Sequence, residues 1–281
     1  MMKASLPKRV RRRRRNFMRK LFLLLVIVLS VGCRPSHREL LDKADEDLIN
    51  QRALLAKYIY LKISKEHTTK DFIRYRALKG LVDVSLTQLY EYPVAVGAME
   101  MIVNEFEGEP QFRGEMPEWR ERLAEVLRIN LQQPRKAKEV LQPLLSREDL
   151  PERIEQEIGQ TLLALNEYTD AEIFFKRAWD KTVSKPECSL ARQLQLNLIQ
   201  TYTLSRRCDL AIEWTEKQLP NPCKPDSLSL LMERANCLEI NGEPGQAIKI
   251  YEDLLKENPK NLRAQFLIQS IRKREREKVK K

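Results

Sequence analysis

The sequence is poor in histidine and glycine, with two and eight residues among 281, and few of its segments alternate between apolar and polar residues. The shortage of alternating segments argues against β-sheet. His37 and His67 lie far apart in the chain, and nothing in the sequence marks a third ligand that would complete a metal site. There is no HExxH motif, P-loop, GxGxxG motif after a strand or nucleophile elbow, and no pair of carboxylates stands out as general acid and base. We therefore predict neither catalysis nor a cofactor or metal.

Most of the formal net charge of +11 comes from residues 1–20, which contain ten Lys or Arg and no acidic residue. Residues 33–281 hold 41 basic and 40 acidic side chains, a balance of +1. The remaining local excess lies in the last ten residues, RKREREKVKK. Binding of DNA through counterion release needs a wide basic surface. We therefore do not expect nucleic acid to be a partner.

The N-terminal segment has the organisation of a secretory signal. An apolar run of 12, residues 21–32, follows the basic head, and it is shorter than the roughly 20 residues that a membrane-spanning helix needs. The small pair Val31-Gly32 precedes Cys33, and this arrangement resembles the lipobox of bacterial lipoproteins, although Ser30 stands where that motif usually has Leu. The resemblance implies that residues 1–32 are removed and that Cys33 carries acyl chains such as palmitate, which anchor the protein to a membrane.

Two features of the export signal stay open at this point. A plain signal peptide cut nearby, or an uncleaved anchor, would also explain the segment. Arg14-Arg15 resembles a twin-arginine export motif, but a long basic head for general secretion fits as well. Arg34 follows Cys33, where an Asp would imply retention at the inner membrane in the best-known sorting rule. We therefore expect an outer-membrane anchor with the body facing the periplasm.

Apolar residues recur three and four positions apart through the body of the chain, as in Leu230, Leu231, Ala235 and Leu238. This spacing is typical of amphipathic helices, and prolines mark short loops between them. The fold class expected is therefore all-α.

The helices also repeat. Ala247 is followed four residues later by Tyr251, and Pro259 lies eight residues further on; Ala171 and Phe175 have the same relation. Corresponding alanines recur 39, 42, 34, 40 and 36 residues apart, at Ala56, Ala95, Ala137, Ala171, Ala211 and Ala247. The pattern resembles the tetratricopeptide repeat (TPR). It implies a right-handed superhelical stack of about six helix pairs over residues 33–261, followed by a capping helix and basic tail, residues 262–281. An unrelated helical solenoid of the same period is the alternative.

Four cysteines lie in the last two repeats, and an exported protein permits disulfides. In the repeat arrangement Cys188 and Cys223 lie in successive inter-repeat loops, and Cys208 and Cys237 lie on antiparallel neighbouring helices. We therefore predict the pairs Cys188–Cys223 and Cys208–Cys237. Buried free thiols that pack as small apolar residues are the alternative.

Arrays that resemble this one bind a partner segment on the wall formed by the first helix of each pair. Amide side chains stand eleven residues before three successive alanines, at Gln160, Gln200 and Asn236, and Gln156, Leu196 and Met232 stand fifteen before. On that wall the amides would hydrogen-bond an extended peptide backbone while Leu196 and Met232 contact its side chains. The same six residues could instead be ordinary solvated helix positions. No Lys or Arg stands at these two offsets, unlike the family's clamp for a terminal carboxylate.

An anchored helical stack resembles in architecture the helical lipoprotein of the outer-membrane β-barrel assembly machinery and the pilotins. We therefore expect a membrane-anchored, periplasm-facing scaffold that binds another envelope protein, or an extended segment of one, in envelope or secretion-complex assembly. The alternative is a binding module for cell-wall glycan or anionic lipid that uses the basic C-terminal tail.

Overall fold

The structure is a computed structural model that describes residues 35–184, 187–219, 223 and 227–279. All regular structure in these ranges is helical, which confirms the predicted fold class. The predicted signal peptide, residues 1–32, and Cys33 lie outside the described residues.

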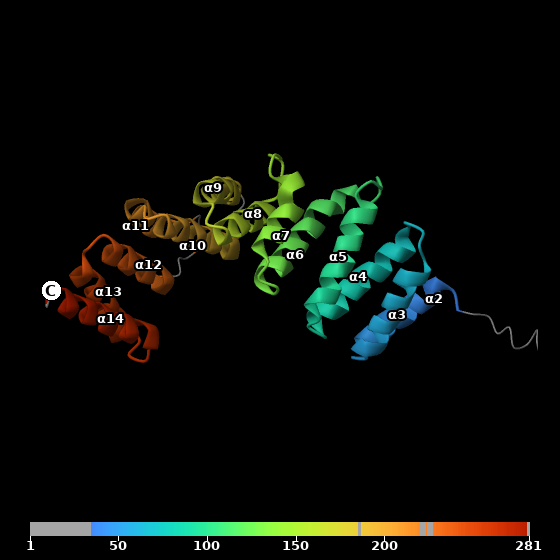
Figure 1. The fold of residues 1–281 in the computed structure, drawn as a ribbon, viewed down its shortest axis with the longest axis horizontal. Coiled ribbons are helices and arrows are strands. Elements are labelled where there is room, and N and C mark those ends of the chain that lie inside the picture. The colour runs from blue at the N-terminus through green and yellow to red at the C-terminus, as the bar shows by residue number, and fades with distance from the viewer. Residues whose placement is uncertain (1–34, 185–186, 220–222, 224–226, 280–281) are drawn as a thin grey trace, which may run out of the picture. The chain divides into compact units, whose positions relative to one another are not determined.

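The helices follow one another in pairs (Figure 1). In chain order they are α2 (His37–Ile49), α3 (Ala53–Glu66), α4 (Phe72–Thr87), α5 (Tyr92–Phe106), α6 (Met116–Ile129), α7 (Pro134–Leu141), α8 (Glu152–Ala164), α9 (Tyr168–Ser184), α10 (Cys188–Leu204), α11 (Cys208–Glu216), α12 (Ser227–Ile240), α13 (Pro244–Glu257) and α14 (Leu262–Val279). Two short 3₁₀ helices, η1 (Arg113–Glu115) and η2 (Gln142–Leu144), precede α6 and follow α7. The six predicted alanines fall one each on α3, α5, α7, α9, α11 and α13, and all are buried. The positions of these alanines therefore follow the predicted repeat in the part of the chain that the structure describes.

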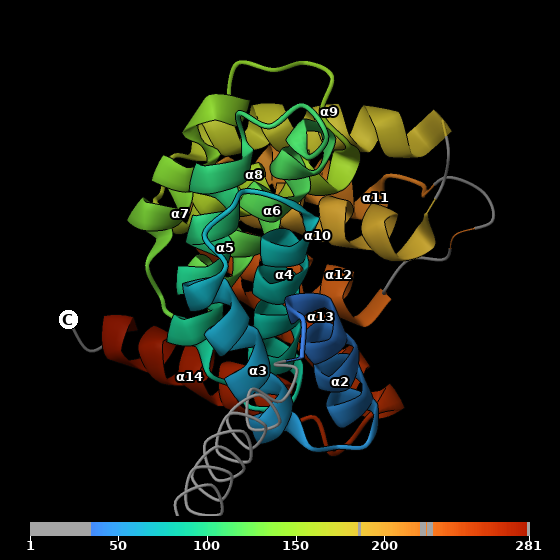
Figure 2. The same cartoon turned by 90° about the vertical axis from the view of Figure 1, so that its right-hand side faces the viewer.

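The chain forms two compact units, with the division between Leu89 and Tyr90. Unit 1 contains α2, α3 and α4, and each of these helices contacts the other two. Unit 2 contains α5 to α14. Within it, α8 packs on α9, α10 on α11 and α12 on α13, and the first helices α6, α8, α10 and α12 pack in succession, as two views show (Figures 1 and 2). The first helices therefore form one wall of unit 2.

A residue with left-handed backbone conformation lies in the turn before each of the helices α3, α5, α7, α9, α11 and α13. This residue lies five positions before the buried alanine in all six turns, with φ between 53° and 83°: Gln51, Tyr90, Gln132, Asn166, Arg206 and Gly242. In four of these turns, the residue that follows the left-handed residue donates its N–H to the carbonyl of the residue five positions before itself, at 2.7–2.9 Å. The four bonds run from Arg52 to Asp47, Glu167 to Leu162, Arg207 to Tyr202 and Glu243 to Leu238. This is the bond that closes a Schellman motif at a helix C-terminus. The turn therefore sets where each second helix begins.

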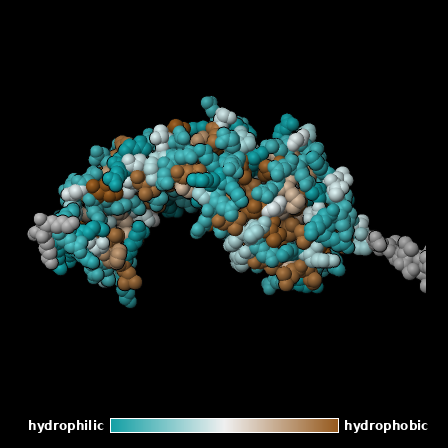
Figure 3. All heavy atoms as spheres, viewed as in Figure 1, coloured by the Kyte–Doolittle hydropathy of each residue, from teal (hydrophilic) through white to brown (hydrophobic). Residues whose placement is uncertain are grey.

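The core lies between the helices and contains large aromatic side chains. Two of these rings pack directly against a glycine of a neighbouring helix. Tyr60, Phe175 and Tyr251 each lie four residues after a predicted alanine and are fully buried. A Cβ added at Gly159 would lie 2.5 Å from the ring of Phe175, and one at Gly80 would lie 2.5 Å from the ring of Tyr60. At these two positions the absence of a side chain on the glycine leaves room for the aromatic ring of a neighbouring helix. On the face shown in Figure 3 the surface is mainly hydrophilic, with smaller hydrophobic patches.

The last helix closes the C-terminal end of unit 2. Ala264, Ile268 and Ile271 of α14 are buried in a cluster with Tyr251 and Leu254 of α13. Leu262 and Phe266 on the other side of α14 are exposed. The structure therefore places α14 as the capping helix that the sequence predicts.

The contact of Gly159 with Phe175 gives a test of the packing. Gly159→Ala should destabilise the protein by about 1–3 kcal/mol, because the new methyl group would displace a buried aromatic ring. Gly97→Ala is the matched control: Gly97 lies within α5 and an added Cβ meets nothing within 4 Å, so the variant should gain about 0.5–1 kcal/mol of helix propensity. Urea unfolding measures both, and equal stability of the two variants would contradict the packing.

Candidate functional site

The six predicted partner-binding residues all lie on first helices of unit 2. Gln156 and Gln160 are on α8, Leu196 and Gln200 on α10, and Met232 and Asn236 on α12. Gln200 and Asn236 are exposed and Gln156 is buried, whereas the other three are half-buried. Met232 packs against the C-terminal core cluster, which gives it a structural role. The residues therefore share a wall, but they do not form one uniform exposed row.

A cavity of about 430 Å³ opens on this wall between α6, α8 and the start of α10. Only two of the predicted residues, Gln156 and Gln160, line it. The complete lining is Glu121, Glu125, Ile129, Arg153, Gln156, Glu157, Gln160, Glu187, Ser189, Leu190 and Gln193. The other four predicted residues, on α10 and α12, do not line this cavity and stay a prediction, whereas the lining carboxylates of α6 were not predicted.

The two predicted amides in the cavity, Gln156 and Gln160, each already have one hydrogen-bond partner. Gln156 Nε2 donates to Gln193 Oε1 at 3.0 Å, and Arg128 Nη2 donates to Gln160 Oε1 at 2.6 Å. An amide can make further hydrogen bonds beyond one. Gln160 keeps its NH₂ group and Gln156 its oxygen for a bound segment, so the two amides have fixed orientations and remaining hydrogen-bonding capacity.

Negative charge dominates the cavity. Arg128 forms a two-point ion pair with the buried Glu157, with contacts of 2.8 and 2.6 Å, and Arg153 pairs with Glu187 at 2.6 Å. Among the residues that the structure describes, Glu121 and Glu125 have no ion-pair partner within 4 Å. The cavity therefore contains two carboxyl groups without a direct ion-pair contact, although Arg153 in the lining acts to lower the pKa of Glu121.

Glu121 shows the effect of this environment on its ionisation. Burial raises the pKa of Glu121 to about 7, and the nearby carboxylates of Glu125 and Glu157 act in the same direction. Burial also raises the pKa of Glu157, while Arg128 opposes the shift. A cation or a cluster of hydrogen-bond donors placed in the cavity would favour the ionised form of Glu121. The site is therefore suited to a positively charged group.

One signal in the sequence could have identified this site. Glu121 and Glu125 are four residues apart on α6, so their like charges lie on one face of a helix, where they repel each other. Such a pair on a wall of first helices is a candidate for binding a cation.

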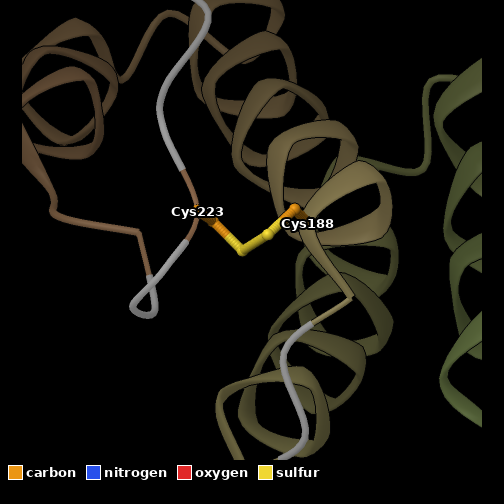
Figure 4. Close-up of a disulfide and its surroundings, with 2 residues drawn as sticks. All are labelled: Cys188 and Cys223. Carbon is orange, nitrogen blue, oxygen red and sulfur yellow. A yellow bond between two sulfur atoms is a disulfide. The ribbon is translucent and has the colours of Figure 1, made fainter.

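The structure contains the predicted Cys188–Cys223 disulfide (Figure 4). Cys188 is the first residue of α10, and Cys223 lies between α11 and α12, with the two Cα atoms 5.0 Å apart. The bond ties the start of α10, next to the cavity residues Ser189 and Leu190, to the segment before α12.

The second predicted pair is not formed. Cys208 and Cys237 are both free and buried. The Thr203 hydroxyl lies 3.2 Å from the Cys237 sulfur, and burial together with the neighbouring Cys237 raises the pKa of Cys208 to about 12. Cys208 and Cys237 are thus buried free thiols, as in the alternative given for them, although Cys237 also makes a polar contact with Thr203.

Within the described part of the chain, no group of three or more His, Cys, Asp or Glu side chains could hold a metal ion. No helix in the same ranges combines the length and apolar character needed to cross a bilayer.

The sequence matches no protein-family model, and a comparison with curated proteins finds no match. Solved structures do resemble the fold. A chain of the APC/C hetero-tetramer Cut9-Hcn1 matches with a TM-score of 0.53 at 16% identity, over 90% of this chain and 45% of that one. A tetratricopeptide repeat protein from Parabacteroides merdae matches with a TM-score of 0.48 at 14% identity, over 88% and 89% of the two chains. The assembly chaperone of RpL4, Acl4, matches with a TM-score of 0.47 at 18% identity, over 88% and 99%.

These similarities concern the fold. The chain spans less than half the length of the Cut9-Hcn1 chain that it matches. It is an all-α stack of TPR-like helix pairs.

The raised pKa of Glu121 predicts a pH-dependent stability. The folded state holds a proton on Glu121 up to about pH 7, whereas the unfolded chain loses it near pH 4.3. The stability linked to this proton is therefore full below the unfolded pKa and is lost as the pH rises through 7. Glu121→Gln should stabilise the protein at pH 8 by about 1–2 kcal/mol after allowance for solvent screening, and by much less at pH 5.

Urea unfolding at the two pH values measures this difference. Glu139→Gln, which changes an exposed carboxylate on α7 outside the cavity, is the control and should show no such pH dependence. A Glu121→Gln variant whose stability changes equally at pH 5 and pH 8 would contradict the assignment.

Proposed function

We propose that the protein is a scaffold that binds a segment of another envelope protein on the wall formed by α6, α8 and α10. The observation that carries the proposal is the cavity on this wall, in which oriented amides lie beside carboxylates without ion-pair partners. The partner segment would place a Lys or Arg side chain near Glu121 and Glu125, while its backbone bonds to Gln156 and Gln160. Ile129 and Leu190 give the cavity apolar contacts for the rest of that segment.

We further propose that the scaffold is tethered through an acylated Cys33 to the periplasmic face of the outer membrane. The support lies in the sequence: the basic head, the short apolar run and the cysteine that follows Val31-Gly32. Several acyl chains give a stable anchor, whereas one chain gives only reversible binding. A tethered repeat wall would hold its partner close to the membrane in which an envelope complex assembles.

The alternative of a glycan- or lipid-binding module based on the basic tail has less support. Three basic residues of α14 already form ion pairs: Arg272 with Glu252, Arg274 with Glu239, and Lys278 with Glu275. These contacts reduce the free positive charge of that helix. Deletion of residues 272–281 distinguishes the two functions, because it should leave binding at the cavity intact.

The tether predicts the behaviour of a cysteine variant. Cys33→Ser removes the thiol that would be acylated, so the protein should move from the membrane pellet to the soluble fraction. Sedimentation of cell extracts at high salt measures the distribution, with the unmodified protein as control. Retention of Cys33→Ser in the pellet would contradict lipid anchoring and favour an uncleaved N-terminal helix. Density fractionation of the unmodified protein tests which membrane holds it.

The cavity predicts which charges the partner needs. A photo-reactive residue at Gln193 would identify the protein that lies in the cavity in cells. Glu121→Gln with Glu125→Gln should then weaken the affinity for that partner by about tenfold at low salt, because a cationic side chain loses its counter-charges. The folded state should not suffer, since loss of the Glu121 charge removes a repulsion.

The matched control is Glu139→Gln with Glu148→Gln, which removes the same charge from two exposed positions outside the cavity. Its affinity should equal that of the unmodified protein. If both double variants bind equally well, the partner does not use the cavity, and exposed positions such as Gln200 and Asn236 become the next candidates.

A further inference from the structure

The outward side of α3 in unit 1 carries a continuous apolar and basic surface. Leu54, Leu55 and Tyr58 are 68%, 53% and 65% exposed. At 100° per residue, these three side chains share an arc of about 120° with three more from the C-terminal half of α3. We call this arc the α3 stripe; it comprises Leu54, Leu55, Tyr58, Leu61, Lys62 and Lys65. It contains no acidic residue.

The α3 stripe is not needed for the core of unit 1. The opposite side of α3 supplies the core with Ala56, Tyr60 and Ile63, all fully buried. A hollow of about 870 Å³ lies beside the stripe and is lined in part by Leu55, Tyr58 and Leu40 of α2. Soluble surfaces rarely expose several large apolar side chains together without a binding role. Something outside the described residues is therefore expected to cover the stripe.

The lysines of the stripe favour a negatively charged surface as its binding partner. Lys62 and Lys65 are exposed, and Glu66 is the only acidic residue of α3. Four acidic residues of α2 line the hollow beside the stripe: Asp42 pairs with Arg76 at 3.0 Å and Asp47 with Arg52 at 2.8 Å, whereas Glu39 and Glu46 are exposed. The positive charge therefore belongs to the stripe itself and not to the α2 side of the hollow.

The position of α3 in the chain indicates what this surface is. Three residues separate Cys33 from His37, the first residue of α2, so the Cα atoms of Cys33 and His37 are at most about 14 Å apart. The ring of His37 contacts the C-terminal end of α3, with Nδ1 3.1 Å from Nδ1 of His67 and Nε2 3.8 Å from Glu66. The lysine end of the stripe therefore lies close to the proposed anchor.

We propose that the α3 stripe lies on the lipid surface in which the acylated Cys33 is anchored. Leu54, Leu55 and Tyr58 enter the boundary between headgroups and acyl chains, and Lys62 and Lys65 extend toward anionic headgroups. Tyrosine suits this boundary, because its ring is apolar and its hydroxyl stays in water. The inference rests on the proposed acylation of Cys33.

The anchor and the stripe would act together. Three apolar side chains on one helix bind a bilayer weakly by themselves, but a tether of three residues keeps them at high effective concentration beside it. The stripe therefore orients unit 1 on the membrane and does not retain the protein there alone, so loss of the anchor still releases the chain.

Lipid quenching tests this contact in the full-length acylated protein. A bimane fluorophore on Leu54→Cys reports the stripe, and the same fluorophore on Ile173→Cys, an exposed apolar position of α9 in unit 2, is the control. Cys188 and Cys223 are bonded, and Cys208 and Cys237 are buried, so the new thiol is the reactive one. In vesicles of phosphatidylcholine and phosphatidylglycerol with nitroxide-labelled chains, fluorescence should be lost at position 54 and kept at position 173.

A second variant tests the charges. Lys62→Glu with Lys65→Glu should reduce the quenching at position 54 in these anionic vesicles and should have a smaller effect in vesicles of phosphatidylcholine alone. Equal quenching with and without the two substitutions in anionic vesicles would overturn the role of the lysines.

The outcomes separate this inference from the proposed anchor. The mass of the N-terminal peptide reports acylation directly, and an unmodified Cys33 would refute the anchor itself. An acylated protein whose position 54 is quenched no more than position 173 would overturn the lipid contact and leave the anchor intact. Protection of position 54 from aqueous iodide without lipid quenching would show that a second copy of the chain covers the stripe, which also overturns the proposal.

Discussion

The fold depends on one repeated backbone constraint, the left-handed residue that ends the first helix of each pair. Because it lies five positions before each buried alanine, it fixes the rotation at which the second helix meets the first. The alanine then faces the crossing, and in α9 the aromatic four residues later reaches Gly159. With the second helices fixed in this way, the first helices α6, α8, α10 and α12 line up as one wall. The cavity is a consequence of this alignment.

The sequence predicted the parts of this fold that depend on side-chain size and spacing. The six alanines, the buried Tyr60, Phe175 and Tyr251, and the Cys188–Cys223 bond all follow from helical period and repeat length. The left-handed residues themselves could not be predicted by type, since Gln51, Tyr90, Gln132 and Arg206 are not residues that favour this conformation. Tertiary packing imposes the left-handed conformation on these four residues. In the two remaining turns the corresponding residues are Asn166 and Gly242, which adopt this conformation more readily.

The candidate site was less predictable because it depends on how neighbouring helices are rotated. The amide positions were placed by counting back from the alanines, which brings Gln156 and Gln160 of α8 to the cavity but does not reveal the carboxylates of α6 beside them. The free thiols Cys208 and Cys237 show the same limit: the sequence brings them to adjacent helices, but bonding depends on sub-ångström placement. The contact between His37 and His67 joins segments whose proximity no local pattern reveals.

The disulfide between Cys188 and Cys223 has a mechanical consequence for a chain that is pulled from its two ends. The bond joins two cysteines that are 35 positions apart in the sequence, and the loop between them contains nearly all of α10 together with α11. Tension applied along the backbone would pass through the sulfur atoms and bypass that loop. About 120 Å of contour length, at 3.3–3.6 Å per residue, would stay withheld even if the enclosed helices melted. The wall next to the cavity would thus yield less under load than the repeats on either side of it.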